Sequence, residues 1–237
     1  MNRFTQAITL ENAAGRVAVI PDIKCRSPKA GDLTRRRDSV AAAQAFVAAG
    51  APLLSVVTEP EHFGGSPDLL RAVVEATGVP VLRKDFITTR AEVRRTADLG
   101  AEAVLLIAAL MDDVTLARLA EEAAACGLTP LVEVATAAEL DRAVGLEARL
   151  IGINNRDITA LERDDGGPER TAALAGGVPL GTLLVSESGI DSPAAAASAV
   201  AAGADAILVG TALWQAPDLA TAYGAFRVAW EDRCRRS

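Results

Sequence analysis

The amino-acid sequence predicts an α/β fold: a single (β/α)8 barrel, or TIM barrel, preceded by a short N-terminal lead. Its 237 residues suit one domain of this size, and 50% of them are apolar, which is enough to fill a core. Short apolar runs rich in β-branched residues alternate with longer segments of helical spacing, eight of each. No linker or change in composition interrupts residues 1–237, so we expect one domain.

The strand-like runs are continuous apolar segments at residues 17–23, 53–57, 79–82, 103–107, 129–134, 150–153, 182–185 and 206–209. Such runs indicate strands buried on both faces, as in a parallel sheet covered by helices. Helical spacing follows each run, at residues 39–49, 67–77, 89–99, 112–126, 136–145, 168–175, 193–202 and 217–232. Glycines that predict left-handed caps end five of these segments: Gly50, Gly78, Gly100, Gly127 and Gly203. An open doubly wound sheet is the alternative, but its glycine-rich phosphate fingerprint is missing after the first strand.

The charge balance argues against polyanionic partners. With 31 acidic and 24 basic residues, the net charge of −7 opposes binding to nucleic acid or to an anionic membrane. The longest apolar run, 103–111, is too short to span a bilayer. Cysteines at 25, 126 and 234 form no CxxC pair, and no apolar signal segment is present, which favours a reducing cytoplasm. His62 is the only histidine, so we expect no metal, and a small molecule is the favoured partner.

Polar residues gather where the predicted strands end. In a (β/α)8 barrel the carboxyl ends of the strands meet in one mouth, so polar side chains there are the first candidates for chemistry. In chain order the candidates are Asp22, Lys24, Thr58, Glu59, Arg83, Lys84, Asp85, Glu133, Asn154, Asn155, Arg156, Ser186, Glu187, Ser188 and Thr211.

The distribution of lysine singles out two positions. Of the 24 basic residues only three are lysine, and two of these, Lys24 and Lys84, end strands. A desolvated lysine can release a proton near neutral pH and arginine cannot, so these positions predict proton transfer; an ion pair is the simpler interpretation. Glu133 lies in an apolar strand, where a carboxylate needs a cation or an acid–base role. Asn154 could orient a hydroxyl or only satisfy backbone groups.

Two glycine-containing turns after the last two strands predict a phosphate site. Backbone N–H groups in these turns of a barrel commonly hold a phosphate, and Gly189 and Gly210 allow its close approach. We expect Ser27 and Arg26 in the first loop to complete the site, with Lys29 as a further charge near the anion.

Seven motifs occur in order along most of the chain. They are IPDIK with SP at 20–28, LSVVTE with F and GS at 54–66, VLRKDF at 81–86, LVEV at 131–134, IGINNR at 151–156, ESGI at 187–190, and GADA with VG at 203–210. Together they resemble the indole-3-glycerol phosphate synthase family of tryptophan biosynthesis. The resemblance implies a decarboxylating ring closure that turns a carboxyphenylamino deoxyribulose phosphate into indole-3-glycerol phosphate, carbon dioxide and water, with no cofactor.

The resemblance also implies roles for individual residues. Lys84 is expected to protonate the substrate carbonyl as the aromatic carbon attacks, and Lys24 to hold the aryl carboxylate and share in proton transfer. Glu133 is expected to act as acid or base in the dehydration. Positions that orient hydroxyls and lysines are Asp22, Asn154 and Glu187. The phosphate site falls on Ser27, Gly189, Gly210 and Thr211. Further substrate contacts are Phe63, Phe86 and Pro28 around the aryl ring, with Arg26, Arg156 and Ser188.

The chain departs from the family's pattern at Asp22, Lys29, Ala135 and Thr211, and its lead is shorter than the family's helical extension, which helps close the site. Other enzyme classes fit the bare residues. Asp22 and Glu133 could be the acid and base of a phosphoribosyl ketol-isomerase, or Lys84 the Schiff-base lysine of an aldolase. A phosphate-binding barrel without activity would leave the strand-end lysines unexplained. We expect a monomer and keep a homodimer open.

Overall fold

The computed structural model describes residues 2–35, 37–158, 161 and 166–230, which form one closed barrel of eight parallel strands. The strands are β1 (Ala18–Ile23), β4 (Leu54–Val57), β5 (Val81–Lys84), β6 (Ala103–Ile107), β7 (Thr129–Val134), β8 (Leu150–Asn154), β9 (Leu183–Glu187) and β10 (Ala206–Val209). Around the barrel they follow the order β1, β10, β9, β8, β7, β6, β5, β4, and β4 pairs again with β1. The predicted fold is therefore confirmed, and each strand overlaps its predicted run with ends that differ by at most two residues.

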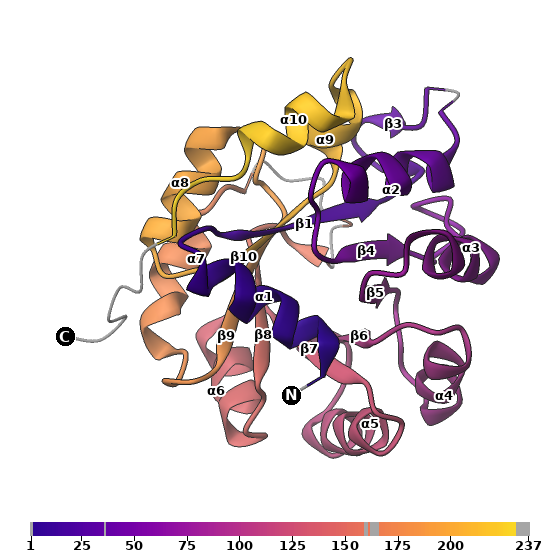
Figure 1. Cartoon of the computed structure of the whole chain (residues 1–237). Coiled ribbons are helices and arrows are strands. Elements are labelled where there is room, and N and C mark those ends of the chain that lie inside the picture. Colours follow the sequence, from indigo (N-terminus) through magenta and orange to yellow (C-terminus); the bar gives the residue numbers. More distant parts are fainter. Residues whose placement is uncertain (1, 36, 159–160, 162–165, 231–237) are drawn as a thin grey trace.

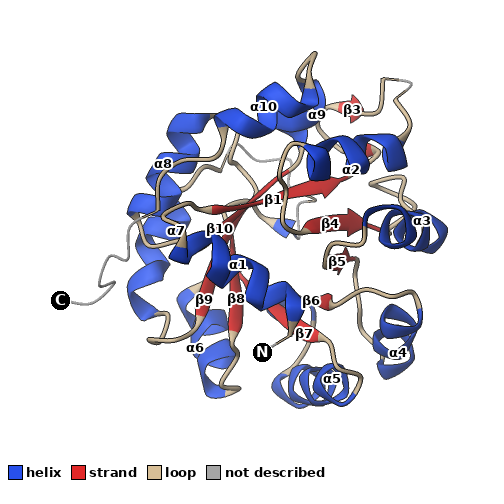
Figure 2. Ribbon diagram, viewed as in Figure 1, coloured by secondary structure: helices blue, strands red, loops and turns tan. Residues whose placement is uncertain are grey.

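Helices surround the strands, as Figure 2 shows in blue around red. The outer helices are α2 (Ser39–Ala48), α3 (Pro67–Thr77), α4 (Arg90–Asp98), α5 (Asp113–Ala125), α6 (Ala137–Gly145), α7 (Glu169–Leu174), α8 (Pro193–Ala201), α9 (Thr211–Gln215) and α10 (Leu219–Ala225). Most begin at an Asp, Ser or Thr whose side chain accepts a backbone N–H of the first turn, as for Asp38, Ser66 and Thr89. The five predicted left-handed glycines all have positive φ.

The N-terminal lead is a helix, α1 (Arg3–Ala13), where the sequence analysis expected no regular element. Phe4 and Ile8 are fully buried and pack with apolar residues inside the barrel. The Arg3 guanidinium donates to the Gly78 carbonyl, before β5, and the Asn2 amide donates to the Glu102 carbonyl, before β6. Figure 1 shows α1 lying across the middle of the barrel. The helix therefore closes the end of the barrel at which the strands begin, opposite the candidate site.

Further features differ from the predictions, among them α9, which none of the predicted helical segments covers. A short hairpin of β2 (Arg26–Ser27) and β3 (Gly31–Asp32) follows β1. Two 3-10 turns, η1 (Ala108–Leu110) and η3 (Ala175–Gly177), follow β6 and α7. The helix predicted at 217–232 ends with α10, and the chain returns to the start of β1 through a bridge between Arg16 and Ala229. Residues 231–232 of that prediction and Cys234 lie outside the described residues.

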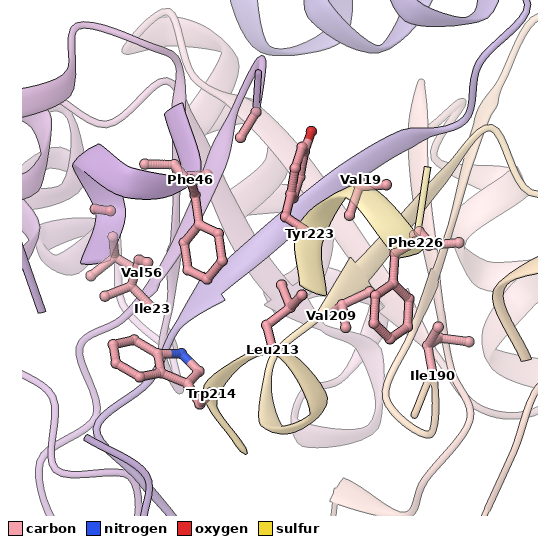
Figure 3. Packing of buried hydrophobic residues seen from close by; sticks show 14 of the residues in the cluster. Val19, Ile23, Phe46, Val56, Ile190, Val209, Leu213, Trp214, Tyr223 and Phe226 are labelled. Carbon is pink, nitrogen blue, oxygen red and sulfur yellow. The ribbon is translucent and has the colours of Figure 1, made fainter. Parts of the chain in front are cut away.

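A layer of aromatic side chains packs between β1 and the surrounding helices (Figure 3). Trp214 of α9 is fully buried, and its indole N–H donates to the Asp22 carbonyl at 2.8 Å. Burial of tryptophan is favourable when its N–H has a partner, so this contact anchors the end of β1 to α9. Phe46 and Tyr223 extend the same layer, with ring centroids 6.3 Å apart. None of the described helices has both the length and the apolar character that crossing a lipid bilayer requires.

Candidate active site

The carboxyl ends of the strands bring most of the predicted polar residues into one mouth. Lys24 follows β1, Lys84 ends β5, Glu133 lies in β7, Asn154 ends β8 and Glu187 ends β9. Apart from Lys84, which is half-buried, they are almost fully buried. Parallel strands all point these ends the same way, which is why residues far apart in sequence meet here.

Lys84 lies between two carboxylates. Its Nζ is 2.9 Å from Glu187 Oε2 and 3.3 Å from Glu133 Oε2. The two glutamate side chains are 0% and 2% exposed, so the ammonium offsets the cost of burying their charge. The ion pair that the sequence analysis kept as the simpler interpretation therefore exists. It also holds the Lys84 amine at a defined point in the mouth, which proton transfer requires.

Gly152 makes room for this arrangement, a role that the sequence analysis missed. Gly152 of β8 pairs with Glu133 of β7 and with Val185 of β9. A Cβ built at Gly152 would overlap Glu187 Oε1, and it would also lie 3.3 Å from Leu131 Cδ1. Because only glycine lacks a Cβ, it lets the Glu187 carboxylate occupy the barrel interior. The motif IGINNR at 151–156 contains this glycine. Its role, however, depends on contacts between strands, which the sequence alone does not show.

Glu133 Oε1 and Asn154 Nδ2 are among the buried side-chain atoms that have no hydrogen-bond partner in the described residues. Asn154 Oδ1 accepts the Arg156 N–H at 2.9 Å, which sets the orientation of the amide and leaves its NH2 group as a donor. Buried polar atoms are costly when unsatisfied, so they mark a place where a ligand or water binds. One acceptor and one donor suit the hydroxyls of a sugar.

An apolar cavity opens on one side of Lys84. Its lining includes Phe63, Phe86, Leu105, Ile107 and Ile158. The Phe63 and Phe86 rings are tilted with centroids 6.4 Å apart, and Lys24 Nζ lies 5.5 Å from the centroid of the Phe63 ring. An ammonium over the face of a ring is attracted to it. The cavity itself holds only about 20 Å³, but its apolar walls and the nearby Lys24 ammonium have the chemistry to contact an aryl group that carries an anionic substituent.

A larger polar cavity of about 510 Å³ opens on the other side, within the usual range for a small-molecule site. Its lining contains the expected phosphate residues and further polar groups: Asp22, Ser27, Lys29, Arg156, Ser188, Gly189, Asp191, Gly210 and Thr211. Ser55 Oγ donates to Asp22 Oδ1 at 2.7 Å and orients that carboxylate. Lys24 and Lys84 line both cavities, so the two amines lie at their junction.

The turn after β9 has a left-handed conformation, with φ of 61° at Ser188 and 67° at Gly189. A Cβ at Gly189 would overlap the carbonyl oxygen of Gly166. The sequence analysis expected this glycine to admit a phosphate. The structure gives it a second role, because the neighbouring loop packs directly against it.

Asn155 holds this turn in place, a role that the sequence analysis did not assign to it. Its side chain is 1% exposed and fully hydrogen-bonded. The amide donates to the carbonyls of Glu187 and Ser188, each at 3.0 Å, and its oxygen accepts from the N–H and hydroxyl of Thr171. Asn155 therefore joins α7 to the strand end that carries Glu187.

Arg26 and Pro28 line neither cavity. The hairpin after β1 turns the Arg26 side chain outward, where its guanidinium donates to the carbonyls of Pro60, Glu61 and His62. The structure therefore connects Arg26 with the loop after β4, where the Phe63 carbonyl also accepts the Arg26 backbone N–H at 2.9 Å.

The loop after β4 is organised by Glu59. This buried carboxylate accepts the backbone N–H groups of Glu61, His62 and Phe63 at 2.8 to 2.9 Å. Burial by itself raises the pKa of Glu59, but these donors outweigh burial and hold the pKa below its ordinary value. The side chains of Glu59, Glu61 and His62 lie close enough together to bind a cation. The Glu59 oxygens, however, already accept hydrogen bonds from the backbone of the loop. Glu59 thereby positions Phe63 in the wall of the apolar cavity.

Comparison with known proteins agrees with this geometry. The sequence profile of indole-3-glycerol phosphate synthase matches residues 2–226. The chain belongs to the indole-3-glycerol phosphate synthase family. A relative of that name from Pyrococcus furiosus is 45% identical over 198 residues, covering 84% of this chain and 86% of its own. One from Deinococcus radiodurans is 43% identical and covers 93% of this chain and 82% of its own.

Among solved structures, orotidine 5′-phosphate decarboxylase from Pyrococcus horikoshii has a similar fold, with a TM-score of 0.64. The match covers 88% of this chain and 96% of that one, at 16% sequence identity. Identity this low supports the barrel fold alone. Membership of the indole-3-glycerol phosphate synthase family rests on the sequence profile and the relatives of that name.

Proposed function

We propose that this chain catalyses the reaction for which its family is named: closure of 1-(2-carboxyphenylamino)-1-deoxyribulose 5-phosphate to indole-3-glycerol phosphate, with release of carbon dioxide and water. The observation that carries the proposal is the position of Lys84. Its amine lies at the junction of an apolar and a polar cavity, between Glu133 and Glu187. A substrate with an aryl group at one end and a phosphate at the other would place its reacting centre at this junction.

Binding uses both cavities. The phosphate occupies the polar cavity on the turns at Ser188–Gly189 and Gly210–Thr211, with Ser27 across the cavity and Arg156 beside it. The aryl ring enters between Phe63 and Phe86, with its carboxylate toward Lys24. Contacts remote from the reacting atoms supply binding energy that orients the carbonyl toward Lys84.

Ring closure needs one proton. The aromatic carbon that bears the carboxylate attacks the ketone carbon of the sugar, and Lys84 Nζ donates a proton to the ketone oxygen, which becomes a hydroxyl. The carboxylate then leaves as carbon dioxide, and its bonding electrons restore the aromatic ring. A positioned proton donor contributes roughly 10²- to 10⁴-fold to such a step.

Dehydration completes the indole. The new hydroxyl leaves as water after taking a proton, and the adjacent carbon loses a proton so that the ring double bond forms. Glu133 is the acid or base of this stage, because its Oε1 has no partner among the described residues and Oε2 contacts Lys84. Asn154 and Asp22 orient the substrate hydroxyls, and Glu187 orients Lys84.

The proposal also covers the oligomeric state, the cellular compartment and the partner of the enzyme. The chain is proposed to act as a monomer. The thiols of Cys25 and Cys126 are free, which is consistent with a reducing cytoplasm. The proposed partner is the phosphorylated small molecule alone.

The test is to mix the purified protein with the carboxyphenylamino deoxyribulose phosphate, without added cofactor, and to follow indole fluorescence and carbon dioxide together. The proposal expects one carbon dioxide for each indole formed. A phosphoribosyl ketol-isomerase would release no carbon dioxide. An aldolase would leave a substrate adduct on Lys84 after borohydride reduction, and either result would overturn the proposal.

A further inference from the structure

Two charged residues flank Lys84, and the proposed reaction uses neither of them. Arg83 precedes Lys84 in β5, and Asp85 follows directly after the strand. Side chains of a strand alternate between its two faces, so Lys84 points into the barrel and Arg83 points toward the outer helices. Arg83 is 4% exposed, and its Nη1 donates to the Thr96 hydroxyl at 3.0 Å and to the Glu92 carbonyl at 3.3 Å, both in α4. A buried guanidinium needs an anionic partner, and Asp85 supplies it.

Arg83, Asp85 and Thr58 form a closed set of hydrogen bonds. Arg83 Nη2 donates to Asp85 Oδ2, and Arg83 Nε donates to Thr58 Oγ1, each at 2.9 Å. The Thr58 hydroxyl completes the set by donating to the same Asp85 oxygen. All three nitrogen atoms of the guanidinium therefore have partners. Because Thr58 comes directly after β4, the set fixes the Asp85 carboxylate relative to both β4 and β5.

The same residues hold the backbone on both sides of Lys84. The Thr58 N–H donates to the Lys84 carbonyl at 2.9 Å. Asp85 Oδ1 accepts the Phe86 N–H at 2.8 Å. The end of β5 is therefore held from outside the barrel, whereas inside it the Lys84 amine contacts two buried carboxylates.

Another buried carboxylate provides a structural comparison. Glu122 of α5 pairs with Arg90 and Arg94, and so joins α5 to α4. None of these three residues lines either cavity of the mouth. Asp85 and Phe86, by contrast, both line the apolar cavity. A shift of the backbone at Asp85 would therefore reach the candidate active site, whereas a shift at Glu122 would not.

We infer that Asp85 is a positioning residue for Lys84 and Phe86. Its carboxylate, held by Arg83 and Thr58, fixes the direction in which the Lys84 side chain leaves the strand and the place of the Phe86 ring in the cavity wall. The position of the Lys84 amine is a property of the folded chain. Only its effect on turnover rests on the proposed function.

Two substitutions open this set of hydrogen bonds. Asp85→Asn replaces one of the two acceptor oxygens with an NH2 group, which cannot accept from the donors on that side. Thr58→Val removes the bridging hydroxyl, keeps the branched shape of the side chain and alters no charge. A displacement of about 1 Å costs a positioned catalytic group roughly 10²-fold in rate, so we expect kcat to fall by about 10- to 10²-fold in Asp85→Asn and by less in Thr58→Val.

The test observes the amine itself, by NMR of protein whose lysines carry ¹³C at Cε. The chain has only three lysines, so the spectrum contains three signals, which Lys24→Arg and Lys29→Arg assign. The samples are the wild type, Asp85→Asn, Thr58→Val and Glu122→Gln. Glu122→Gln is the matched control, because it also removes the charge of a buried carboxylate that pairs with arginine.

We expect Asp85→Asn and Thr58→Val to shift the Lys84 signal and to lower kcat. Glu122→Gln should lower the urea midpoint and leave both the signal and kcat unchanged. Glycerol 3-phosphate, a phosphate monoester, should bind all four proteins with the same dissociation constant in calorimetric titrations, because none of the substituted residues lines the polar cavity.

Asp85→Asn and Thr58→Val that lose stability but keep the Lys84 signal would overturn the inference, since the set would then be as structural as the pairs of Glu122. A shifted signal with an unchanged kcat would overturn it too. Should Asp85→Asn fail to fold, Thr58→Val alone decides by the same criteria. If the wild type closes no ring while the Lys84 signal shifts as expected, the proposed function fails and the positioning of Lys84 by Asp85 stands.

Discussion

Lys84 and Glu187 are 103 residues apart in the chain, yet Lys84 Nζ lies 2.9 Å from Glu187 Oε2. The contact crosses the barrel mouth from β5 to β9, and Glu133 of β7 joins it at 3.3 Å. Packing therefore turns a lysine that could have been a surface charge into a fixed amine between two buried carboxylates. That geometry supports the proposed role of Lys84 as a proton donor.

The position of Glu187 depends on Gly152, so Gly152→Ala should displace it. The new Cβ would occupy the space of Glu187 Oε1, and this flexible side chain can move away from Lys84. We expect kcat to fall by roughly 10²-fold, since a displacement of about 1 Å has this effect on a positioned catalytic group, while KM and the urea midpoint change little. Steady-state kinetics and urea unfolding provide the check. Gly145→Ala is the control, because no atom lies within 4 Å of its added Cβ; a similar loss of kcat there would contradict the argument.

Glu133→Gln should slow the reaction without weakening phosphate binding. Gln keeps the shape of the side chain but cannot exchange a proton as a carboxyl group does, so kcat is expected to fall by about 10²- to 10⁴-fold. Glu133 does not line the polar cavity, and inorganic phosphate should therefore inhibit the variant with an unchanged inhibition constant. Normal turnover with weakened phosphate inhibition would make Glu133 a structural residue.

Glu59→Gln should destabilise the protein at neutral pH and much less in acid. Gln has one acceptor oxygen in place of two for the three N–H groups of the loop, so we expect a loss of about 1–2 kcal/mol. The pKa of Glu59 in the folded protein lies below its ordinary value. Its stabilising effect is therefore complete above the unfolded-state pKa of about 4.3 and declines as the pH falls through the folded-state value.

Urea unfolding of the wild type and Glu59→Gln across this pH range measures the effect. The difference in unfolding free energy should shrink as the pH is lowered. Glu61→Gln, which changes an exposed carboxylate two residues away, should leave stability unaltered throughout. A difference that stays constant with pH would show that Glu59 acts through packing rather than through its charge.

The strands, and the gathering of polar residues at their carboxyl ends, could be predicted because each depends on local signals. Buried parallel strands are short and mostly apolar, so their limits in the sequence are sharp, and residues such as Lys84 stand out at the ends. Helix α1 also carried a readable signal, with Asn2 as a cap and Phe4 and Ile8 four residues apart. The resemblance drew attention instead to an extension over the active end of the barrel, whereas α1 closes the other end.

Other features depend on contacts between distant segments. Gly152 leaves space for Glu187, which lies on the neighbouring strand. The Asn155 amide likewise donates hydrogen bonds to the carbonyls of Glu187 and Ser188. Both contacts join residues that are adjacent in the barrel but far apart in the sequence. The sequence analysis expects Arg26 of the first loop to complete the phosphate site. The hairpin after β1, which the apolar pattern does not reveal, turns its side chain toward the loop after β4.

The central claim is that Lys84 delivers a proton, and Lys84→Arg tests it most directly. Arginine keeps the positive charge between Glu133 and Glu187 but does not release a proton near neutral pH. The measurement is the rate of indole fluorescence from the carboxyphenylamino deoxyribulose phosphate, together with the dissociation constant of glycerol 3-phosphate. We predict a rate lower by roughly 10²- to 10⁴-fold with an unchanged dissociation constant. A variant that turns over as fast as the wild type would contradict the claim.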